Sequence, residues 1–482
     1  MPDTLESLKP SNIWKYFSLL NAIPRASKKE EQVIAFMKEF GEHLGLETIV
    51  DDLGNVLIKK PSTSDKKDSP TIIMQGHLDM VHQKNDSTDF DFDTQGIDMY
   101  IDDDYVRARG TTLGADNGIG VAAIMSVLAS DDMSHPELEA IFTIDEEVGM
   151  TGAMGLKKGF LRGDILLNLD SEEDHVLTVG SAGGVDVAIE GSCEMMEVEE
   201  CMFFELSVEG LSGGHSGVDI HKGLCNAIKV LTRVLFEINK DFSVRISTLH
   251  GGDLMNAIPR ECHATFAVNK SDASQVEQEF SQWNTRLKVE NNFSDPHLNI
   301  QVKQIYSAQK VLSQSAQKQI LSSLYTCPNG IYRMTPSMNN LVQSSNNLAK
   351  IRLGDGQFSI GCHTRSFIES ERDDLVNVIR HSFAHGDAIV KEVGPYPGWN
   401  PDPNTKTVAT LKRVYESLYG NPPEIFAIHA GLECGIFAET YPHLEIISFG
   451  PNITGAHSPD EALQISSTQK FWNYLTAVLT EL

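Results

Sequence analysis

The first third of this 482-residue chain carries short apolar segments that each end in a cluster of polar residues. Three of these segments, 71–74, 140–144 and 165–169, are bounded by turn residues, and their length and setting predict buried strands. Between the first two, apolar residues recur at helical spacing over 121–128. Strands that alternate with helices are typical of a mostly parallel sheet flanked by helices. We therefore expect an α/β fold here.

The pattern changes after residue 184 and returns near residue 395. Two successive strand–helix–strand–strand groups are predicted in between, the first over 203–268 and the second over 298–383. Five prolines and glycines over 395–403 predict a stiff linker, after which the α/β pattern resumes. We predict one α/β domain in two parts, 1–184 and 395–482, interrupted by an inserted α+β domain, 185–394, built as a duplicated β-α-β-β unit.

Charge and cysteine content exclude several classes of function. The chain has 67 acidic and 39 basic residues and a net charge of −28, which argues against nucleic acid or an anionic membrane as its main partner. Its apolar runs are shorter than the roughly 18 residues of a membrane span. Seven cysteines without a C-x-x-C pair argue against a disulfide framework and a thiolate zinc site. We expect a cytoplasmic protein whose metals are held by histidine and carboxylate.

Five polar positions lie at predicted strand ends or in glycine-rich turns. They are His77, Asp116, Glu147, Asp170 and His457. Two imidazoles and three carboxylates suit two adjacent zinc ions if one carboxylate bridges them. Two metals ~3.5–4 Å apart can share a hydroxide and polarise a carbonyl at the same time. The donor set therefore favours a hydrolytic two-metal site, in which manganese or cobalt could replace zinc.

Two further carboxylates accompany these positions. Glu146 directly precedes Glu147 at a strand end and could act as general base toward the attacking water. Asp79 is two residues from His77, a spacing that puts both on one side of an extended segment, where the carboxylate can orient the imidazole. Each motif alone has an ordinary reading: Asp-Glu-Glu is typical of a solvated turn, and Ser458 could cap a helix that begins at Pro459. Their ordered combination favours a site.

The ordered series Gly-His-Leu-Asp-Met-Val, Gly-Ala-Asp-Asn-Gly, Asp-Glu-Glu-Val-Gly, Asn-Leu-Asp and His-Ser-Pro-Asp-Glu resembles the co-catalytic zinc family of aminoacylases, dipeptidases and glutamate-releasing carboxypeptidases. The resemblance covers essentially the whole chain, and the length and the long insert look most like its bacterial dipeptidases. It implies a zinc-exopeptidase-like domain with an inserted lid. It also implies a di-zinc dipeptidase for unblocked dipeptides, with Xaa-His substrates, β-alanyl-histidine included, favoured.

The resemblance assigns roles to the polar positions. One zinc would be held by His77, Asp116 and Asp170, and the other by Glu147, Asp116 and His457, with Asp116 bridging. Members of this family tend to have a cis peptide bond after the bridging aspartate, here between residues 116 and 117. Asp79 would orient His77, and Glu146 would be the general base.

The insert and the segment after it supply further candidates through the same resemblance. His215 would donate to the oxyanion of the tetrahedral intermediate. Asn256 and Arg365 would bind the carboxylate of the substrate, and Gly431 would make a backbone contact to it. An arginine offers a bidentate fork for a carboxylate, so the role suits the residue type. The resemblance further implies a homodimer.

Two alternatives remain at this stage. An aminoacylase or a carboxypeptidase could use the same scaffold and the same metal ligands. A non-catalytic relative that serves as a binding protein is the second alternative, but such relatives usually lack a ligand or the base, and all seven positions are filled here.

Overall fold

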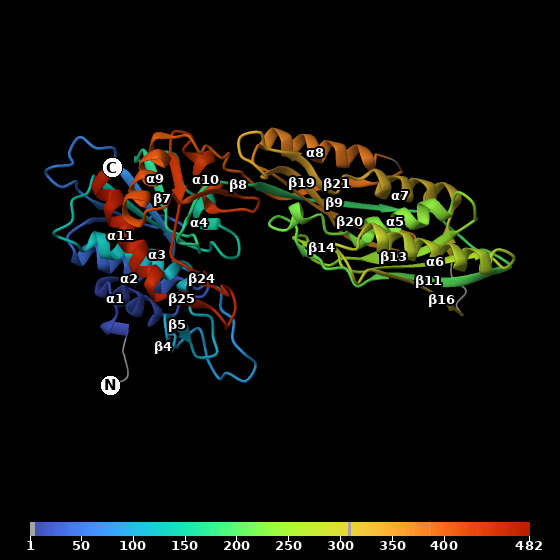
Figure 1. Ribbon diagram of the computed structural model, residues 1–482, viewed down its shortest axis with the longest axis horizontal. Helices are drawn as coiled ribbons and strands as arrows, with labels where there is room; N and C mark the ends of the chain where they lie inside the picture. Colours follow the sequence, from blue (N-terminus) through green and yellow to red (C-terminus); the bar gives the residue numbers. More distant parts are fainter. Residues whose placement is uncertain (1–4, 307–309, 385) are drawn as a thin grey trace. The chain divides into compact units, whose positions relative to one another are not determined.

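The structure, a computed structural model, describes residues 5–306, 310–384 and 386–482. The chain divides into two compact units (Figure 1). Unit 1 comprises the chain up to Gly180 together with Pro401–Ala427 and Leu432–Leu482. Unit 2 comprises Ser181–Asn400 and the short segment Ile428–Gly431. The chain therefore passes between the units more than once.

Unit 1 is built on an eight-stranded sheet with the order β1-β2-β6-β3-β7-β23-β8-β22. Its four central strands, β6, β3, β7 and β23, run parallel, whereas β1, β2 and β8 pair in the antiparallel sense. The strands are β1 (Glu47–Val50), β2 (Val56–Lys60), β3 (Ile72–His77), β6 (Leu138–Thr143), β7 (Ile165–Asn168), β8 (Val176–Ser181), β22 (Glu424–Ile428) and β23 (Glu445–Ser448). The predicted α/β fold is confirmed.

The central strands are buried along almost their whole length because both faces of the sheet are covered. All residues of β3, β6 and β7 are buried. The helix α3 is buried almost all round, since it packs against both α1 and β3. The helices of this unit are α1 (Ser11–Asn21), α2 (Glu31–His43), α3 (Ala115–Leu128), α4 (Thr151–Met154), α9 (Lys406–Tyr419), α10 (Glu433–Thr440) and α11 (Ile465–Glu481), with a 3-10 turn at Leu5–Ser7.

A small four-stranded sheet joins distant parts of unit 1. Its order is β24-β25-β5-β4, from strands β4 (Met99–Asp102), β5 (Tyr105–Ala108), β24 (Ile453–Thr454) and β25 (Ala462–Gln464). The pairing of Leu463 with Val106 fixes the loop 455–461 next to the segment that leads into α3. This small sheet therefore brings the C-terminal His-Ser-Pro-Asp-Glu motif to the predicted strand ends.

The start of α2 differs from what its sequence pattern predicts. Ser27 followed by Glu30 predicts a capping box, but the helix begins at Glu31 with Glu30 at its cap position. The Ser27 hydroxyl instead donates to Asp79 Oδ2 at 2.8 Å. A contact to a buried carboxylate thus replaces the local cap.

Unit 2 contains a nine-stranded sheet in which the pairings are antiparallel, with the order β16-β11-β15-β13-β19-β20-β9-β21 and with β18 paired to β19. Its strands are β9 (Gly183–Ser192), β11 (Cys201–Glu209), β13 (Arg245–Gly251), β15 (Cys262–Asn269), β16 (Asn299–Ile305), β18 (Gly330–Met334), β19 (Val342–Gly354), β20 (Gln357–Ser366) and β21 (Ile389–Tyr396). Two small pairs accompany it, β10 (Met195–Met196) with β17 (Val311–Leu312) and β12 (Gly214–His215) with β14 (Ala257–Ile258).

The helices of unit 2 are α5 (Ala227–Ile238), α6 (Ala273–Glu290), α7 (Gln314–Thr326) and α8 (Glu369–Ser382), with a 3-10 turn at Ile220–Lys222. The order β11–α5–β13–β15 matches the first predicted group, and β16–α7–β19–β20 matches the second, with β17 and β18 as added short strands. The two groups meet where β13 pairs with β19, with Leu249 opposite Leu353. Most buried apolar side chains of these elements form one core, and Phe203, Ala267 and Val311 form a separate small cluster.

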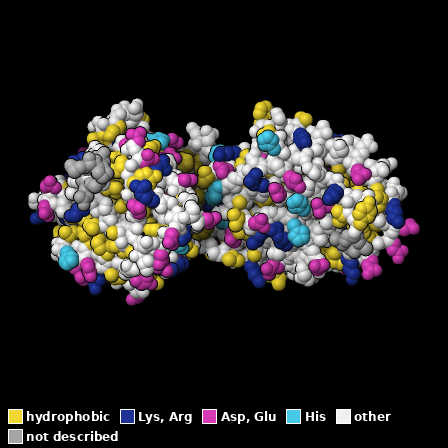
Figure 2. Space-filling view, turned by 90° about the horizontal axis from the view of Figure 1, so that it is seen from below, with side chains coloured by type: hydrophobic (Ala, Val, Ile, Leu, Met, Phe, Trp, Pro, Cys, Tyr) yellow, Lys and Arg dark blue, Asp and Glu magenta, His cyan; other side chains and the backbone are white. Residues whose placement is uncertain are grey.

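The surface carries charged side chains of both signs. Over the visible face of both units, acidic and basic side chains are interspersed among the described residues (Figure 2). Among the same residues, no helix is both long enough and apolar enough to cross a bilayer.

Candidate active site

The polar residues that follow the parallel strands of unit 1 meet at one edge of the sheet. His77 is the last residue of β3 and lies opposite Thr143, the last residue of β6. Gln75 lies opposite Asn168, the last residue of β7. Because the three strands are parallel and in register, the segments that follow them lie side by side.

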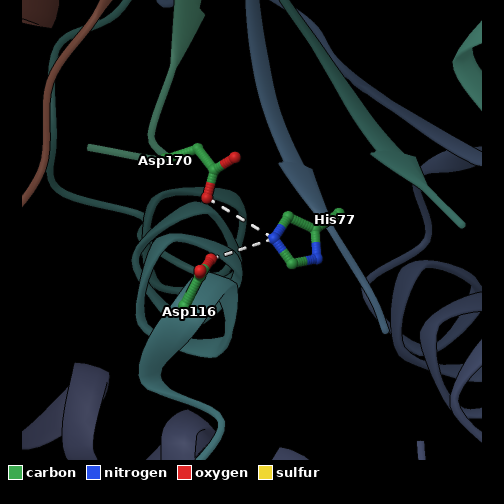
Figure 3. A group of neighbouring side chains, drawn as sticks. All are labelled: His77, Asp116 and Asp170. Atoms are coloured by element: carbon green, nitrogen blue, oxygen red, sulfur yellow. Dashed lines mark hydrogen bonds and ion pairs between the residues drawn. The ribbon is translucent and has the colours of Figure 1, made fainter. Parts of the chain in front are cut away.

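The first group of side chains comes from β3, the start of α3 and the loop after β7 (Figure 3). His77 Nε2 lies 3.0 Å from Asp116 Oδ1 and 3.5 Å from Asp170 Oδ1. His77 is fully buried, and the two carboxylates are largely so. The three ligand atoms lie within 4.8 Å of one another, a spacing that suits a single bound cation.

A second group shares Asp116 with the first. His457 Nε2 lies 3.1 Å from Asp116 Oδ2 and 2.9 Å from Glu147 Oε2. The two oxygens of Asp116 thus face two different imidazoles, which is the arrangement expected of a bridging carboxylate. Glu146 forms a third group with His77 and Glu147, in which one ligand atom from each also lies within 4.8 Å of the others.

Asp79 connects the first group to the Glu146–Glu147 turn. Its Oδ1 lies 3.4 Å from His77 Nδ1 and accepts a hydrogen bond from the backbone N–H of Glu146 at 3.0 Å. Burial opposes ionisation of Asp79, but the contacts with His77 and the hydrogen bond from the Glu146 N–H outweigh it and lower the pKa of Asp79 to about 2. With Nδ1 beside Asp79, Nε2 of the His77 ring is turned toward Asp116 and Asp170.

Several residues that sequence reasoning did not single out hold the backbone around Asp116. Glu461 is buried, and its carboxylate accepts backbone N–H groups of Leu113, Gly114 and Ala115 at 2.7, 2.9 and 2.7 Å and that of Asp116 at 3.3 Å. This carboxylate lies at the N-terminal end of α3, where the helix dipole favours negative charge. The peptide bond between Asp116 and Asn117 is cis.

Arg25 holds the same loop from its carbonyl side. Its guanidinium donates to the carbonyl oxygen of Gly114 at 2.6 Å and to those of Leu78 and Asp79 at 3.1 Å. Burial lowers the pKa of Arg25 to about 10, so the side chain remains a cation at neutral pH. One buried cation therefore ties the loop after β3 to the loop before α3.

Glu433, the first residue of α10, connects neighbouring strands of the sheet through its side chain. Its Oε2 accepts hydrogen bonds from Gln75 Nε2 at 2.8 Å and from Thr143 Oγ1 at 2.7 Å. Gln75 in turn accepts a hydrogen bond from Asn168 Nδ2. Burial raises the pKa of Glu433 to about 7. The network therefore reaches each of the three strands that carry His77, the Glu146–Glu147 turn and Asp170.

The chemistry of this donor set fits bound metal ions. Burial raises the pKa of Asp170 and of Glu146 well above the ordinary range, because carboxylates are crowded together away from water. Glu147 Oε1 is buried without a hydrogen-bond partner among the described residues. Cations bound between the carboxylates would relieve both costs. The side chains of unit 1 thus form a candidate metal-ligand cluster.

The remaining candidates, His215, Asn256, Arg365 and Gly431, all belong to unit 2. His215 Nδ1 accepts hydrogen bonds from the backbone N–H groups of Gly217 and Val218 at 3.2 and 3.1 Å. A Cβ placed on Gly217 would lie 3.1 Å both from Arg365 Nε and from the His215 ring. Gly217 therefore packs closely between His215 and Arg365, and a side chain at this position would crowd both.

Asn256 is exposed in a turn whose backbone is held from both sides. The amide of Asn347 donates to the carbonyl oxygens of Met255 at 3.2 Å and Ala257 at 2.8 Å. The carbonyl oxygen of Asn256 itself accepts the backbone N–H of Ser216 at 2.7 Å, which joins this turn to the segment that follows His215. Asn347 was missed because a strand asparagine gives no signal of which turn it will support.

Arg365 is buried on β20, and the segment with Gly431 reaches the same region. A Cβ on Gly217 would lie 2.2 Å from the carbonyl oxygen of His429, and one on Gly431 would lie 2.8 Å from the ring of Tyr396. The Nη1 of Arg365 donates to the hydroxyl of Tyr396 at 2.9 Å. His215, Arg365 and Gly431 are thus neighbours within unit 2.

Comparison with known proteins gives one family and two close relatives. The family model described as peptidase family M20/M25/M40 matches residues 73–481. The cytosol non-specific dipeptidase of Escherichia coli strain K12 is 37% identical over 479 residues, which cover 99% of this chain and 99% of that protein. The crystal structure of an aminoacylhistidine dipeptidase from Vibrio alginolyticus matches with a TM-score of 0.95 at 38% identity, covering 99% of this chain and 98% of that one.

A more distant structure shares the fold. The aminopeptidase PepT from Bacillus cereus matches with a TM-score of 0.58 at 16% identity, covering 98% of this chain and 99% of that one.

Proposed function

This chain belongs to peptidase family M20/M25/M40, a family of hydrolases that act on peptide bonds, and from this membership we propose that it is a metal-dependent dipeptidase. Sequence identity of 37% to a cytosol non-specific dipeptidase and of 38% to an aminoacylhistidine dipeptidase, each over 99% of this chain, supports this activity. The observation that carries the mechanism is the placement of Asp116, whose two oxygens face His77 and His457.

The cofactor that we propose is a pair of zinc ions, for which manganese or cobalt could substitute. His77, Asp116 and Asp170 would hold one ion, and Glu147, Asp116 and His457 the other. When bound, such a pair supplies Lewis acidity that activates a water molecule and polarises the peptide carbonyl. Asp79 keeps the His77 ring oriented through the Nδ1 contact at 3.4 Å.

Glu146 is the general base in this proposal. Its backbone N–H is held by Asp79, and its carboxylate lies in one group with His77 and Glu147. From there it would take the proton of the attacking water and deliver it to the leaving amine. Glu147, and not Glu146, is the proposed metal ligand, so the Glu146 carboxylate is left to act as the base.

His215 would stabilise the oxyanion that forms on the carbonyl. Because its Nδ1 accepts two backbone N–H groups, the proton of the neutral ring is on Nε2, which makes Nε2 a donor. Burial lowers the pKa of His215, which keeps the ring neutral at pH 7. A neutral ring with a fixed donor is the form that oxyanion stabilisation requires.

The selection of short substrates is assigned to three further residues of unit 2. We assign Arg365 and Asn256 to the terminal carboxylate of the substrate and Gly431 to a backbone contact. A clamp on that carboxylate leaves room only for short peptides. Xaa-His dipeptides, β-alanyl-histidine included, and other unblocked dipeptides are the proposed substrates. The proposal also includes a cytoplasmic homodimer.

The test is hydrolysis of β-alanyl-histidine and Leu-Gly by the purified protein, before and after chelation and with zinc or manganese added back. Cleavage of both substrates only in the presence of metal supports a broad dipeptidase, and cleavage of the histidyl substrate alone supports a narrow one. N-acetyl-Leu-Gly is the matched control for an aminoacylase on the same scaffold. If the metal-loaded protein cleaves only the acetylated compound, the dipeptidase proposal is wrong.

A further inference from the structure

The guanidinium of Arg365 has one nitrogen bound to the protein and one edge that remains available. Nη1 donates to the Tyr396 hydroxyl at 2.9 Å. Nε is buried and has no hydrogen-bond partner within the described part of the chain. The Nε–Nη2 edge of an arginine presents two parallel N–H groups, which match the two oxygens of a carboxylate. A Cβ at position 217 would lie only 3.1 Å from Nε, closer than an ordinary van der Waals contact, so a side chain there would crowd this nitrogen and only glycine fits beside it.

Behind Nη1, a chain of hydrogen bonds has a defined direction. Because the Tyr396 oxygen accepts from Arg365, its own proton is free to point to His363 Nε2, 3.5 Å away. His363 Nδ1 then donates to Asp186. Burial lowers the pKa of His363, which favours the neutral ring that this direction requires. Tyr396 therefore connects Arg365, through His363, to the carboxylate of Asp186.

The position of the Tyr396 ring is fixed from several sides. A Cβ on Gly184 would lie 2.4 Å from the Tyr396 hydroxyl, and one on Gly431 would lie 2.8 Å from the ring carbon Cε2. Both neighbours therefore have to be glycine for the ring to fit. The carbonyl oxygen of Tyr396 accepts from Arg372 Nη1 at 3.1 Å. Because the ring is packed in this way, the position of the Tyr396 hydroxyl is fixed.

We propose that Tyr396 is a positioning residue that fixes the plane of the Arg365 guanidinium, so that its Nε–Nη2 edge receives the free carboxylate of the substrate. This rests on the proposed dipeptidase function and adds a residue through which Arg365 selects substrates with an unblocked C-terminus. His363 supports the Tyr396 hydroxyl, and Asp186 in turn supports His363. Without the Tyr396 hydroxyl, the guanidinium keeps its charge and loses its orientation.

The experiment uses full-length metal-loaded protein, the variant Tyr396→Phe, and two substrates that differ only at the C-terminus, Leu-Gly and Leu-Gly amide. For Leu-Gly, kcat/KM should fall roughly tenfold, mainly through a rise in KM, as expected for loss of one hydrogen bond to a charged group. For the amide, kcat/KM should stay within about twofold, since no carboxylate is present to bind. The ratio between the two substrates is the readout.

Two further variants make the result specific. Tyr332→Phe is the matched control, because Tyr332 is half exposed on β18, and it should leave the ratio unchanged. In an Arg365→Ala background, Tyr396→Phe should have no further effect on the ratio, since Tyr396 acts through Arg365. If Tyr396→Phe does not fold, His363→Gln should lower the ratio in the same direction.

The outcomes separate the two proposals. An equal loss on both substrates would show a general structural role for Tyr396 and would overturn the inference, as would full activity on both. Failure of the metal-loaded wild-type protein to cleave either dipeptide would instead overturn the proposed function on which the inference rests.

Discussion

The carboxylate of Glu461 accepts the backbone N–H of Asp116 at 3.3 Å, although the two residues are 345 positions apart in the chain. The same carboxylate accepts the three preceding N–H groups, so the loop that carries the shared ligand is held by one side chain. Glu461 also lies four residues after His457. The residue that fixes the Asp116 loop thus belongs to the loop that carries the second imidazole.

Glu461→Gln should weaken metal binding. The amide keeps the shape of the side chain but loses the charge that strengthens four hydrogen bonds to backbone N–H groups. Losses of roughly 10- to 100-fold in metal affinity are typical when a partner of a ligand is altered. Metal content measured after dialysis against a series of chelator concentrations checks this. Glu47→Gln, at an exposed position on β1, is the control, and equal metal retention in the two variants would contradict the prediction.

Glu146→Ala should retain its metal and lose turnover. General base catalysis contributes roughly 10²- to 10⁴-fold, and the variant should lose activity on Leu-Gly by a factor in this range. The metal-to-protein ratio should stay at the wild-type value because Glu146 is not an assigned ligand. Val148→Ala serves as the control two residues away, at an exposed position. Normal activity of Glu146→Ala would remove the base assignment.

His215→Ala should lower kcat on Leu-Gly by about 10²- to 10³-fold, the effect of removing one oxyanion donor. Metal content should not change, since His215 lies in unit 2 and the proposed ligands lie in unit 1. The matched control is His221→Ala, a histidine in the same unit that has no assigned role. A large rise in KM with unchanged kcat would point to substrate binding instead.

Asp295→Asn should reduce the stability of the protein most at neutral pH. Asp295 is buried and accepts the backbone N–H groups of Ser212 and Cys225, both at 2.8 Å. Burial opposes ionisation, but these hydrogen bonds outweigh it and hold the pKa of Asp295 below its ordinary value. The stabilisation is therefore complete above the ordinary pKa near 4 and is lost as the pH falls through the lower pKa of the folded state.

Urea unfolding of wild type and Asp295→Asn at pH 7 and near pH 3 measures this effect. The difference in unfolding free energy should be about 2 kcal/mol at pH 7, as for buried hydrogen bonds to a charged group, and smaller at pH 3. Asp241→Asn, at an exposed position in the turn after α5, controls for the loss of one negative charge. A difference that grows toward low pH would mean that the pKa of Asp295 is raised.

The sequence was sufficient to predict the α/β fold and to select the polar strand ends, since both follow from local patterns. His77 and Asp170 follow apolar runs within three residues, and the parallel sheet then places them together. Glu433 and Arg25 could not be predicted in the same way. A buried glutamate or arginine acquires its role only from partners far along the chain, such as Gln75, which is 358 positions from Glu433.

Two local patterns led to different readings. Ser27 has the spacing of a capping box, but its hydroxyl has a stronger acceptor in Asp79, which is placed there by the sheet. The segment 395–403 has the composition of a linker, but its second residue, Tyr396, ends β21 with its hydroxyl on Arg365. Proline content describes the stiffness of a segment and carries no information on what its side chains contact.

The hydrogen bonds of Glu433 have a consequence for how this protein can change over evolutionary time. One carboxylate oxygen serves both Gln75 and Thr143, and Gln75 also serves Asn168. A substitution at any one of these four positions leaves a buried polar group without a partner, which costs roughly 1–3 kcal/mol. Relatives that replace Glu433 should therefore carry compensating replacements at the other three positions. The four residues should thus vary together among relatives.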